Sequence, residues 1–291
     1  MGKEEQKSSQ PPTYLGVKDT TLDSVQKEAA RLLTFADLFN PHTEAVLKEV
    51  GLNLTGKKVV IMGMGPGTEI SIYQKMDAAE IIGVDQNPQM LEVARRQFSP
   101  NGNVRLIGDD VANLEKYIDP SSVDLIAARV LWQHIHPNKQ SSIMEHCVQV
   151  LKPGGACLFE DFFNIDPTWQ LEPTCPAFQN LRAKFGLMYK RTEMPEDMAS
   201  CLEALCKNAG LKIRQPDTQR PWEYSVSSEG HPEFKGSHIQ LLQRVGQGMI
   251  QMGIISTEEF QSDMSQFTAH LAKEHVIIWT PKMKQVFAVK E

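Results

Sequence analysis

A short apolar segment that runs directly into three alternating glycines constrains the fold of this chain more than any other feature. The segment VVIM at residues 59–62 is followed by GMGPG at residues 63–67. Glycine tolerates positive φ and, lacking a Cβ, lets the backbone approach a ligand closely. The free N–H groups of a helix that starts after such a turn would face the same ligand. The pattern predicts a strand, a ligand-binding turn and a helix.

The alternation of short apolar runs and helical stretches continues over the next hundred residues. Further strands are predicted at residues 81–84, 104–107, 123–127 and 156–160, with helical stretches such as 89–96 and 141–150 between them. Continuous apolar runs are typical of a parallel sheet that helices cover on both faces. We therefore expect an α/β fold with a doubly wound, Rossmann-like core.

The segments that flank this core have other patterns. Apolar residues recur at helical spacing over residues 22–39, and Pro41 is expected to open a second short helix that ends at Gly51. Residues 1–20 are polar and are expected to be flexible. After residue 161 helices are predicted up to Tyr189 and over 238–253 and 257–273, and two strands at 276–280 and 285–289 come last. We expect one domain over 21–291, with a cofactor-binding core at about 45–161.

Composition limits the possible partners. A net charge of -6 gives no concentrated basic footprint for nucleic acid. No apolar run is long enough to cross a bilayer, so no membrane partner is expected. The five cysteines contain no C-x-x-C pair and are interpreted as reduced, mostly buried thiols. We expect a cytoplasmic protein.

The glycine spacing distinguishes two kinds of nucleotide site. A dinucleotide fingerprint would need glycine at position 68, where Thr68 stands. Asp85 ends the second predicted strand, at about the distance from Gly63 where an acidic residue reaches ribose hydroxyls. It could instead cap the helix that begins near Pro88. Asp109 and Asp110 follow the third strand, where a carboxylate can accept from an exocyclic amine or serve as an ordinary turn residue.

Taken together, the glycine loop, Asp85, Gly108-Asp109 and the sequence LKPGG at 151–155 resemble the class I S-adenosylmethionine-dependent methyltransferases. The resemblance is to the small-molecule group and covers about residues 22–161. It implies a methyltransferase domain with a seven-stranded sheet, in which residues 276–289 form the closing antiparallel hairpin. An α-helical cap, at about 162–195 and 225–274, would then be inserted before the last strands and bind the substrate.

The resemblance also implies S-adenosyl-L-methionine as the cofactor and assigns residues to it. Asp85 would hold the ribose hydroxyls and Asp109 the adenine amine, with Gln86 and Asp110 beside the adenosine. Residues of the loop would line the methionine part, and residues beyond the fourth strand would lie near the methyl group: Gly63, Met64, Gly65 and Gly67, then Arg129, Val130 and Gln133.

One position departs from the family pattern. The family usually has an acidic residue two positions before the first glycine, where this chain has Ile61. That acid helps to orient the amino group of the methionine. Glu69, just after the loop, is the candidate to replace it.

A sulfonium methyl group is already activated, so SN2 transfer mainly requires alignment of nucleophile, methyl and sulfur. A protein base is needed only if the acceptor must lose a proton early. The candidates are His134 and Glu160, together with the neighbouring His136 and Asp161, although a histidine here could simply pack under a helix. No set of metal ligands accompanies the histidines, so no metal is expected.

Two other functions stay open at this point. An aminopropyl transferase would use the decarboxylated form of the same cofactor and would carry acidic diamine-binding residues, for which Glu160-Asp161 is the only support. A non-catalytic regulatory protein could keep S-adenosylmethionine binding without turnover, which Ile61 alone suggests. The motifs expected for nucleic-acid methylation are missing after the fourth strand, where Ala127-Ala128-Arg129-Val130 stands. The acceptor and the oligomeric state are not predicted.

Overall fold

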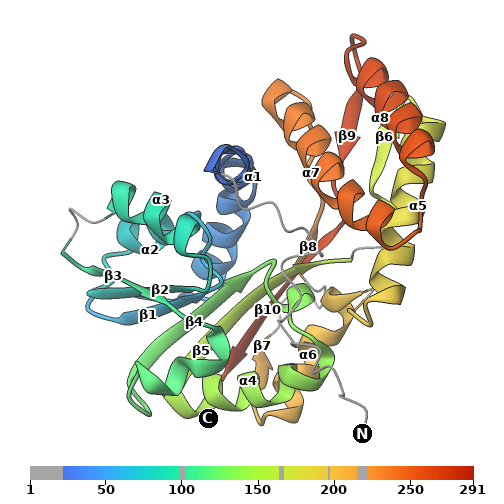
Figure 1. The fold of residues 1–291 in the computed structure, drawn as a ribbon. Coiled ribbons are helices and arrows are strands. Elements are labelled where there is room, and N and C mark those ends of the chain that lie inside the picture. The colour runs from blue at the N-terminus through green and yellow to red at the C-terminus, as the bar shows by residue number, and fades with distance from the viewer. Residues whose placement is uncertain (1–21, 99–101, 164–166, 196, 215–221) are drawn as a thin grey trace, which may run out of the picture.

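The computed structural model describes residues 22–98, 102–163, 167–195, 197–214 and 222–291 (Figure 1). The N-terminal segment 1–20, expected to be flexible, lies outside the described residues. Five parallel strands in the order β3-β2-β1-β4-β5 form most of a large sheet, and β10 and β7 complete it. These strands are β1 (Lys58–Met62), β2 (Glu80–Asp85), β3 (Val104–Gly108), β4 (Val123–Arg129), β5 (Leu151–Phe162), β7 (Lys212–Arg214) and β10 (Met283–Val289).

The doubly wound α/β architecture is confirmed, and so are all five predicted parallel strands. The apolar runs of β1, β2, β4 and β5 are buried because helices cover both faces of the sheet there, whereas β3 at the edge is partly exposed. β10 runs antiparallel to β5. On its other side β10 pairs with β7 and also with the short strand β8 (Trp222–Tyr224). The two short strands together occupy the seventh position of the sheet.

The predicted closing hairpin is wrong. Strand β9 (Ile277–Trp279) does not pair with β10 but with β6 (Gln170–Glu172), in a separate two-stranded sheet. The reason is burial, because Ile278 of β9 is fully enclosed in the apolar core of the cap, opposite Leu171. Two strands joined by a short turn predict a hairpin, but their pattern does not reveal that one of them belongs to another core.

The expected break at Pro41 is also wrong. One helix, α1 (Leu22–Glu49), continues through the proline. Proline removes one backbone hydrogen bond from a helix interior and disfavours helical geometry before it. Here burial on both sides offsets that cost, since Phe39, Val46 and Leu47 all lie against the protein interior.

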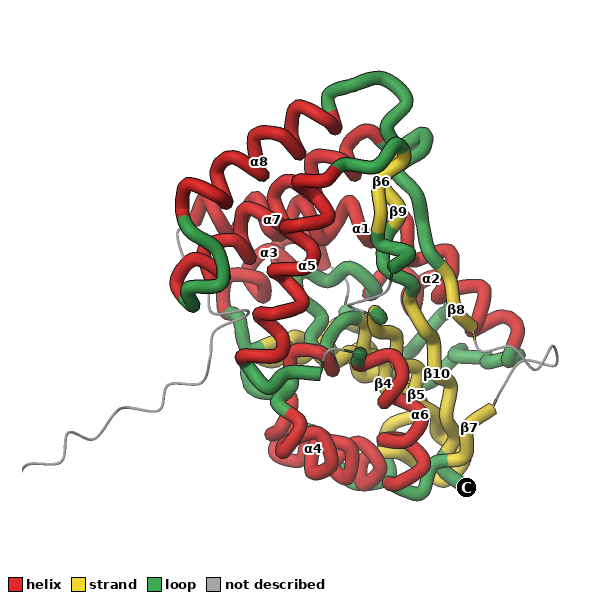
Figure 2. Tube along the Cα trace, turned by 90° about the vertical axis from the view of Figure 1, so that its right-hand side faces the viewer, coloured by secondary structure: helices red, strands yellow, loops and turns green. Residues whose placement is uncertain are grey.

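Helices cover the two faces of the sheet with separate apolar cores. Residues of α1, α2 (Ile70–Lys75) and α3 (Pro88–Phe98) pack on one face. Residues of α4 (Pro137–Val150), α6 (Met198–Asn208) and the 3-10 segment η2 (Val111–Lys116) pack on the other. Figure 2 shows α4 and α6 on the side of the sheet away from α1 and α3.

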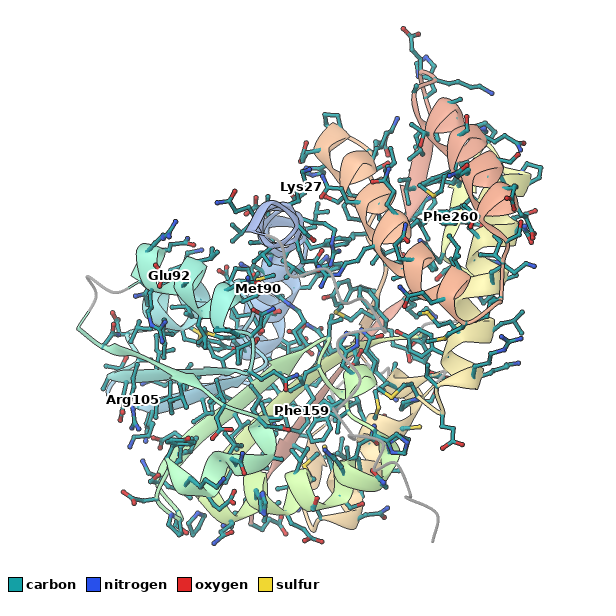
Figure 3. The ribbon with its side chains drawn as sticks, viewed as in Figure 1. Lys27, Met90, Glu92, Arg105, Phe159 and Phe260 are labelled. Atoms are coloured by element: carbon teal, nitrogen blue, oxygen red, sulfur yellow. The ribbon has the colours of Figure 1, made fainter. Side chains whose placement is uncertain are left out.

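The inserted residues build a third core beyond the ends of the strands. It is formed by α5 (Pro176–Arg191), α7 (Pro232–Gln251) and α8 (Thr257–Leu271) with β6 and β9. Helix α1 lies between this cap and α3 (Figure 1), since Phe35 packs against Phe234 of α7 and Val25 and Ala29 pack against Met90 of α3 (Figure 3). Helix α1 therefore bridges the core and the cap.

The close approach of α7 and α8 gives a prediction for stability. A Cβ at Gly246 would lie 2.1 Å from Cζ of Phe260, the α8 residue labelled in Figure 3. Gly246→Ala should therefore lower the free energy of unfolding by about 1–3 kcal/mol, although alanine favours helix. Urea denaturation measures this change. The matched control is Gly236→Ala in the same helix, where a Cβ would meet nothing within 4 Å and a small gain is expected. Equal effects of the two substitutions would contradict the packing argument.

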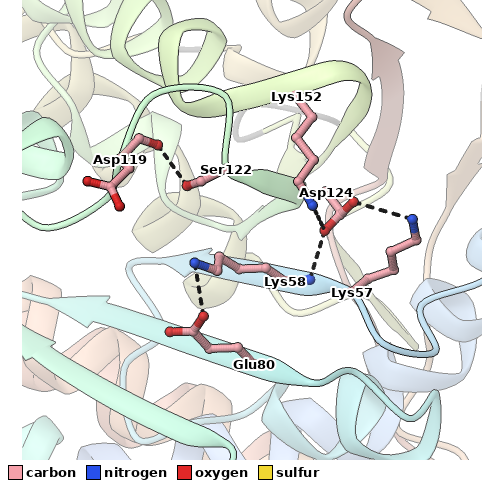
Figure 4. Close-up of polar contacts among 7 residues, drawn as sticks. All are labelled: Lys57, Lys58, Glu80, Asp119, Ser122, Asp124 and Lys152. Atoms are coloured by element: carbon pink, nitrogen blue, oxygen red, sulfur yellow. Dashed lines mark hydrogen bonds and ion pairs between the residues drawn. The ribbon is translucent and has the colours of Figure 1, made fainter.

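An ionic cluster ties the strands together at the opposite edge of the sheet. Asp124 accepts from the Lys58 backbone N–H at 2.9 Å and from Lys152 Nζ at 2.7 Å, and Lys57 Nζ lies 3.5 Å away (Figure 4). The hydrogen bonds from Lys152 and Lys58 overcome the effect of burial and hold the pKa of Asp124 below its usual value. This cluster lies at the amino ends of β1 and β4, away from the glycine loop, and its role is structural.

Among the residues that the structure describes, no helix is both long and apolar enough to span a membrane.

Candidate active site

The glycine loop has the backbone geometry that its sequence requires. Gly63, Gly65 and Gly67 have φ angles of 61°, 55° and 91°, which other residues rarely adopt. A Cβ at Gly63 would lie 2.6 Å from Leu131, and one at Gly67 would lie 2.6 Å from Phe98. Both steric space and φ therefore exclude side chains at these positions. Met64 is buried between them and contacts Gly83 of β2.

Asp85 joins the end of β2 to this loop. Its Oδ2 accepts from the Gly65 N–H at 2.8 Å, and its Oδ1 accepts from the Asn87 N–H at 2.8 Å. The helix-capping role belongs to Asn87, whose Oδ1 accepts from the Gln89 and Met90 N–H groups at 3.0 and 3.3 Å. Burial raises the pKa of Asp85, and its two backbone donors partly offset this. The Asp85 carboxylate therefore lies at the glycine loop, and Asn87 caps the helix in its place.

Asp109 lies beside Asp85, because Asp85 is paired with Gly108 in the parallel register. It accepts from Tyr117 Oη at 2.5 Å and from Asn113 Nδ2 at 2.8 Å. The hydrogen bonds from Tyr117 and Asn113 hold the pKa of Asp109 below its usual value. Asp110 caps η2 by accepting from the Ala112 N–H at 3.0 Å, and Gln86 is exposed. These residues line the same edge of the sheet as the loop.

A buried polar network lies on the α1 side of the strand ends. Thr43 of α1 donates to the carboxylate of Glu160, with Oγ1 at 2.7 Å and 2.9 Å from its two oxygens. Gln285 Nε2 donates to the same carboxylate at 2.6 Å. Arg129 donates from Nη1 to Thr43 Oγ1 at 3.2 Å and from Nη2 to Asn40 Oδ1 at 2.9 Å. Glu160 and Arg129 are therefore linked through Thr43, inside the protein.

Glu69 belongs to the same buried region, at the start of α2. Burial raises the pKa of Glu69 to about 7, which the Arg129 charge opposes and the Glu160 charge reinforces. Tyr73, one turn further along α2, interacts with Glu69 and is also fully enclosed. Ile61 has no exposed surface and packs in the apolar core below. Two carboxylates and a single guanidinium thus meet here among the described residues.

A second cluster lies where the core meets the cap. The 3-10 turn η3 (Trp132–His134) follows β4, and Asp161 Oδ2 accepts from the Gln133 N–H at 3.1 Å. Tyr189 of α5 donates to Gln133 Oε1 at 3.1 Å. Burial lowers the pKa of His134 to about 3, with the Glu28 charge opposing it. Arg129 and Gln133, only four positions apart in the sequence, thus lie in separate clusters.

Asp161 gives a testable pH dependence. Burial raises its pKa from 3.8 to about 7, so folding disfavours the ionised form. This penalty is absent below pH 3.8, grows as the pH rises and is complete above pH 7. The difference in the free energy of unfolding between Asp161→Asn and wild type should therefore increase, in favour of the variant, by about 3 kcal/mol from pH 5 to pH 8. Urea denaturation across this range measures the gain. The control is Asp119→Asn, which alters an exposed aspartate and should show no such increase with pH. If the stability difference between Asp161→Asn and wild type did not change with pH, the raised pKa of Asp161 would be refuted.

The backbone just after β4 is strained. Val130 has a φ of 56°, and its N–H donates to the Glu160 carbonyl at 2.7 Å. A β-branched residue at positive φ is a genuine outlier, and such strain gathers at functional sites. The strain lies between Arg129 and η3, where the two clusters described above meet.

Several residues of this site were not expected from the sequence. Asn40, Thr43, Tyr73 and Gln285 all contribute to the network around Arg129 and Glu160. The available signal was a threonine inside an apolar helical face, between Phe39 and Val46. A polar residue on such a face needs a buried partner, but the sequence does not show which partner it finds.

The comparisons with known proteins agree with this geometry. Residues 59–155 match a family model described as a methyltransferase domain, which contains the glycine loop, Asp85 and Asp109. This match supports the resemblance to the class I S-adenosylmethionine-dependent methyltransferases that the motifs predict. Its strand order, with one antiparallel strand beside β5, is that of the expected family fold.

Curated relatives of this methyltransferase domain include two ubiquinone biosynthesis O-methyltransferases. The protein of Photorhabdus laumondii is 30% identical over 116 residues, which cover 39% of this chain and 46% of the relative. The protein of Azoarcus sp. is 29% identical over 168 residues, which cover 55% of this chain and 66% of the relative. The chain thus spans about half to two thirds of the length of these relatives.

Solved structures share the fold at low sequence identity. The YcgJ protein of Bacillus subtilis has a TM-score of 0.53 at 16% identity, covering 86% of this chain and 99% of its own. The cyclase SpnF has a TM-score of 0.52 at 14% identity, covering 86% and 81%. These likenesses cover most of the chain, and they concern the fold alone.

The residues at the strand ends fit S-adenosylmethionine, the cofactor of this superfamily. A Cβ at Gly63 or Gly67 would collide with Leu131 or Phe98, so the loop keeps glycine there, and backbone without side chains can approach a ligand closely. Asp85 presents a carboxylate beside it, with acceptor capacity beyond its two backbone donors. Within the described ranges, no three histidine, cysteine, aspartate or glutamate side chains are arranged to hold a metal ion.

Proposed function

We propose that the protein transfers the methyl group of S-adenosylmethionine to an oxygen, nitrogen or carbon atom of a small molecule. The observation that carries this proposal is the Asp85 carboxylate held against the Gly65 N–H at 2.8 Å, inside the matched methyltransferase domain. A carboxylate beside a bare glycine loop supplies acceptors for ribose hydroxyls where the loop meets the cofactor. In this proposal Asp109 accepts from the adenine amine, with Gln86 and Asp110 beside the adenosine.

The acceptor is proposed to bind between the core and the cap. Aromatic side chains of the cap meet the core here, since Phe234 of α7 packs against Phe35 of α1 and Tyr189 of α5 donates to Gln133 of η3. Apolar walls of this kind exclude water and enclose small ligands. The names of the curated relatives support a small-molecule acceptor, and an oxygen atom is the first acceptor to test. Nucleic acid is not proposed as a substrate, and the cytoplasm is proposed as the location because the described cysteines are free thiols.

The bound cofactor supplies an activated sulfonium methyl group. The protein aligns the acceptor with it and excludes water, which are the main requirements of this transfer. His134 and Glu160 remain the proposed bases, and they differ in pKa and in hydrogen-bond partners. The low pKa of His134, about 3, leaves its imidazole neutral but weakly basic at neutral pH. Glu160 is held by Thr43 and Gln285. Alignment therefore contributes more than proton removal in this proposal.

Two measurements test the proposed function. Isothermal titration with S-adenosylmethionine should show binding, and mass spectrometry should detect a methylated product in a panel of phenols, amines and carboxylic acids. Absence of binding at millimolar cofactor would refute the cofactor assignment. Binding without any methylated acceptor would favour a regulatory protein, and transfer of an aminopropyl group from the decarboxylated cofactor would replace the proposed reaction.

A further inference from the structure

A single side chain of α1 connects the glycine loop to the buried network. Asn40 Nδ2 donates to the Thr68 carbonyl at 3.1 Å, and its Oδ1 accepts from Arg129 Nη2 at 2.9 Å. Both ends of the amide are therefore engaged, by groups far from Asn40 in sequence. The Thr68 carbonyl directly follows Gly67, so this contact holds the point where the loop becomes α2.

Other polar contacts of the last loop residues, among the described parts of the chain, are local. Gly67 N–H donates to the Met64 carbonyl at 3.0 Å, the Ile70 N–H donates to the Gly67 carbonyl at 3.2 Å, and Asp85 anchors Gly65. Three left-handed glycines in five residues make this backbone costly to order, because glycine loses the most conformational freedom. An outside contact at Thr68 would reduce the number of alternative loop conformations.

Helix α1 is itself held in place from both sides. Val25 and Ala29 pack against Met90 of α3, and Arg244 of α7 lies 3.4 Å from Glu28. Leu32 of the same helix stands 3.7 Å from the position of a Cβ at Gly65. Asn40 is thus a fixed point from which the loop can be positioned.

We propose that Asn40 is a positioning residue that holds the glycine loop in its ligand-binding conformation. The expected effect of Asn40 on cofactor affinity rests on the proposed function. Its effect on the conformation of the glycine loop does not. Asn40 has no proposed contact with the reacting atoms. It acts through the Thr68 carbonyl, so its loss should affect cofactor affinity and leave the chemical step unchanged.

The test compares Asn40→Ala with Asn40→Asp and with a control on the same helix. The aspartate can still accept from Arg129 but cannot donate to the Thr68 carbonyl, so the two variants separate the two contacts. The control is Glu44→Ala, one turn along α1, which removes an exposed ion pair to Lys75 of α2 at 3.0 Å. Both Asn40 variants should weaken S-adenosylmethionine binding about 10-fold. They should raise KM for the cofactor without lowering kcat at saturation, and Glu44→Ala should change neither.

Hydrogen exchange of the cofactor-free protein supplies a readout that does not depend on activity. Amides of residues 64–70 should exchange faster in both Asn40 variants than in wild type or Glu44→Ala. Wild-type exchange in Asn40→Asp would overturn the proposal, since the Arg129 contact would then suffice. The proposal would also be overturned if folded Asn40→Ala kept the hydrogen-exchange rates and the cofactor affinity of wild type. Faster exchange in a protein that binds no cofactor at all would uphold the positioning of the loop and refute the proposed function instead.

Discussion

Replacing Asp85 with alanine should weaken S-adenosylmethionine binding at least 100-fold while the chain stays folded. The carboxylate holds the Gly65 N–H at 2.8 Å, and its remaining acceptor capacity is proposed to receive the ribose hydroxyls. Hydrogen bonds to a charged group contribute about 1.5–3 kcal/mol each, so losing two corresponds to at least that factor. Isothermal titration measures the affinity, and circular dichroism checks the fold.

Two further variants sharpen this result. Asp85→Asn keeps one oxygen acceptor and should lie between wild type and Asp85→Ala. Asp119→Ala removes an exposed carboxylate beyond η2 and should bind the cofactor as wild type does. If Asp85→Ala bound the cofactor with wild-type affinity, the ribose assignment would be wrong even though the loop geometry stood.

Replacing Arg129 with methionine should lower the free energy of unfolding by about 3–5 kcal/mol. The side chain is buried, and its charge lies near two enclosed carboxylates, Glu69 and Glu160. Removing one partner of a buried charged group leaves the others without compensation, which costs this amount. Methionine fills similar volume, so lost packing contributes little.

The loss at Arg129 should also grow with pH. Without the guanidinium the pKa of Glu69, already raised to about 7, should rise further, so ionisation at alkaline pH destabilises the variant more. Urea denaturation at pH 6 and pH 8 tests both statements. Arg105→Met, which alters an exposed arginine of β3 (Figure 3), should change stability by less than about 0.5 kcal/mol. A similar small effect at Arg129 would show that the cluster is not electrostatically coupled.

The cofactor edge of the fold could be predicted from the sequence because its signals are local. Strands β1 and β2 contain continuous apolar runs, β3 and β4 contain apolar runs interrupted by Arg105 and Asp124, and the glycines and Asp85 follow directly at strand ends. Parallel strands bring their carboxyl ends to one edge, so local motifs become one site without any knowledge of distant contacts.

Distant partnerships could not be predicted in this way. The apolar run around Ile278 fits any buried strand, and only the cap explains why it pairs with Leu171 instead of with β10. Pro41 was expected to start a helix because the cost of an internal proline is local, whereas the burial that offsets it comes from the whole core. Thr43 and Gln285 reach Glu160 from opposite ends of the chain. Such pairs depend on tertiary packing, which neither periodicity nor spacing records.

The place of β10 in the sheet has a consequence for how the protein is made. This strand lies between β5 and the short strands β7 and β8, and Cys157 of β5 is paired with Ala288 of β10. Until the ribosome has released β10, the edge of β5 has no partner on that side, while the whole cap has already emerged. Contacts so distant in sequence slow folding and leave strand edges open to association. The sheet can therefore close only once β10 has emerged, and until then the edge of β5 is open to association.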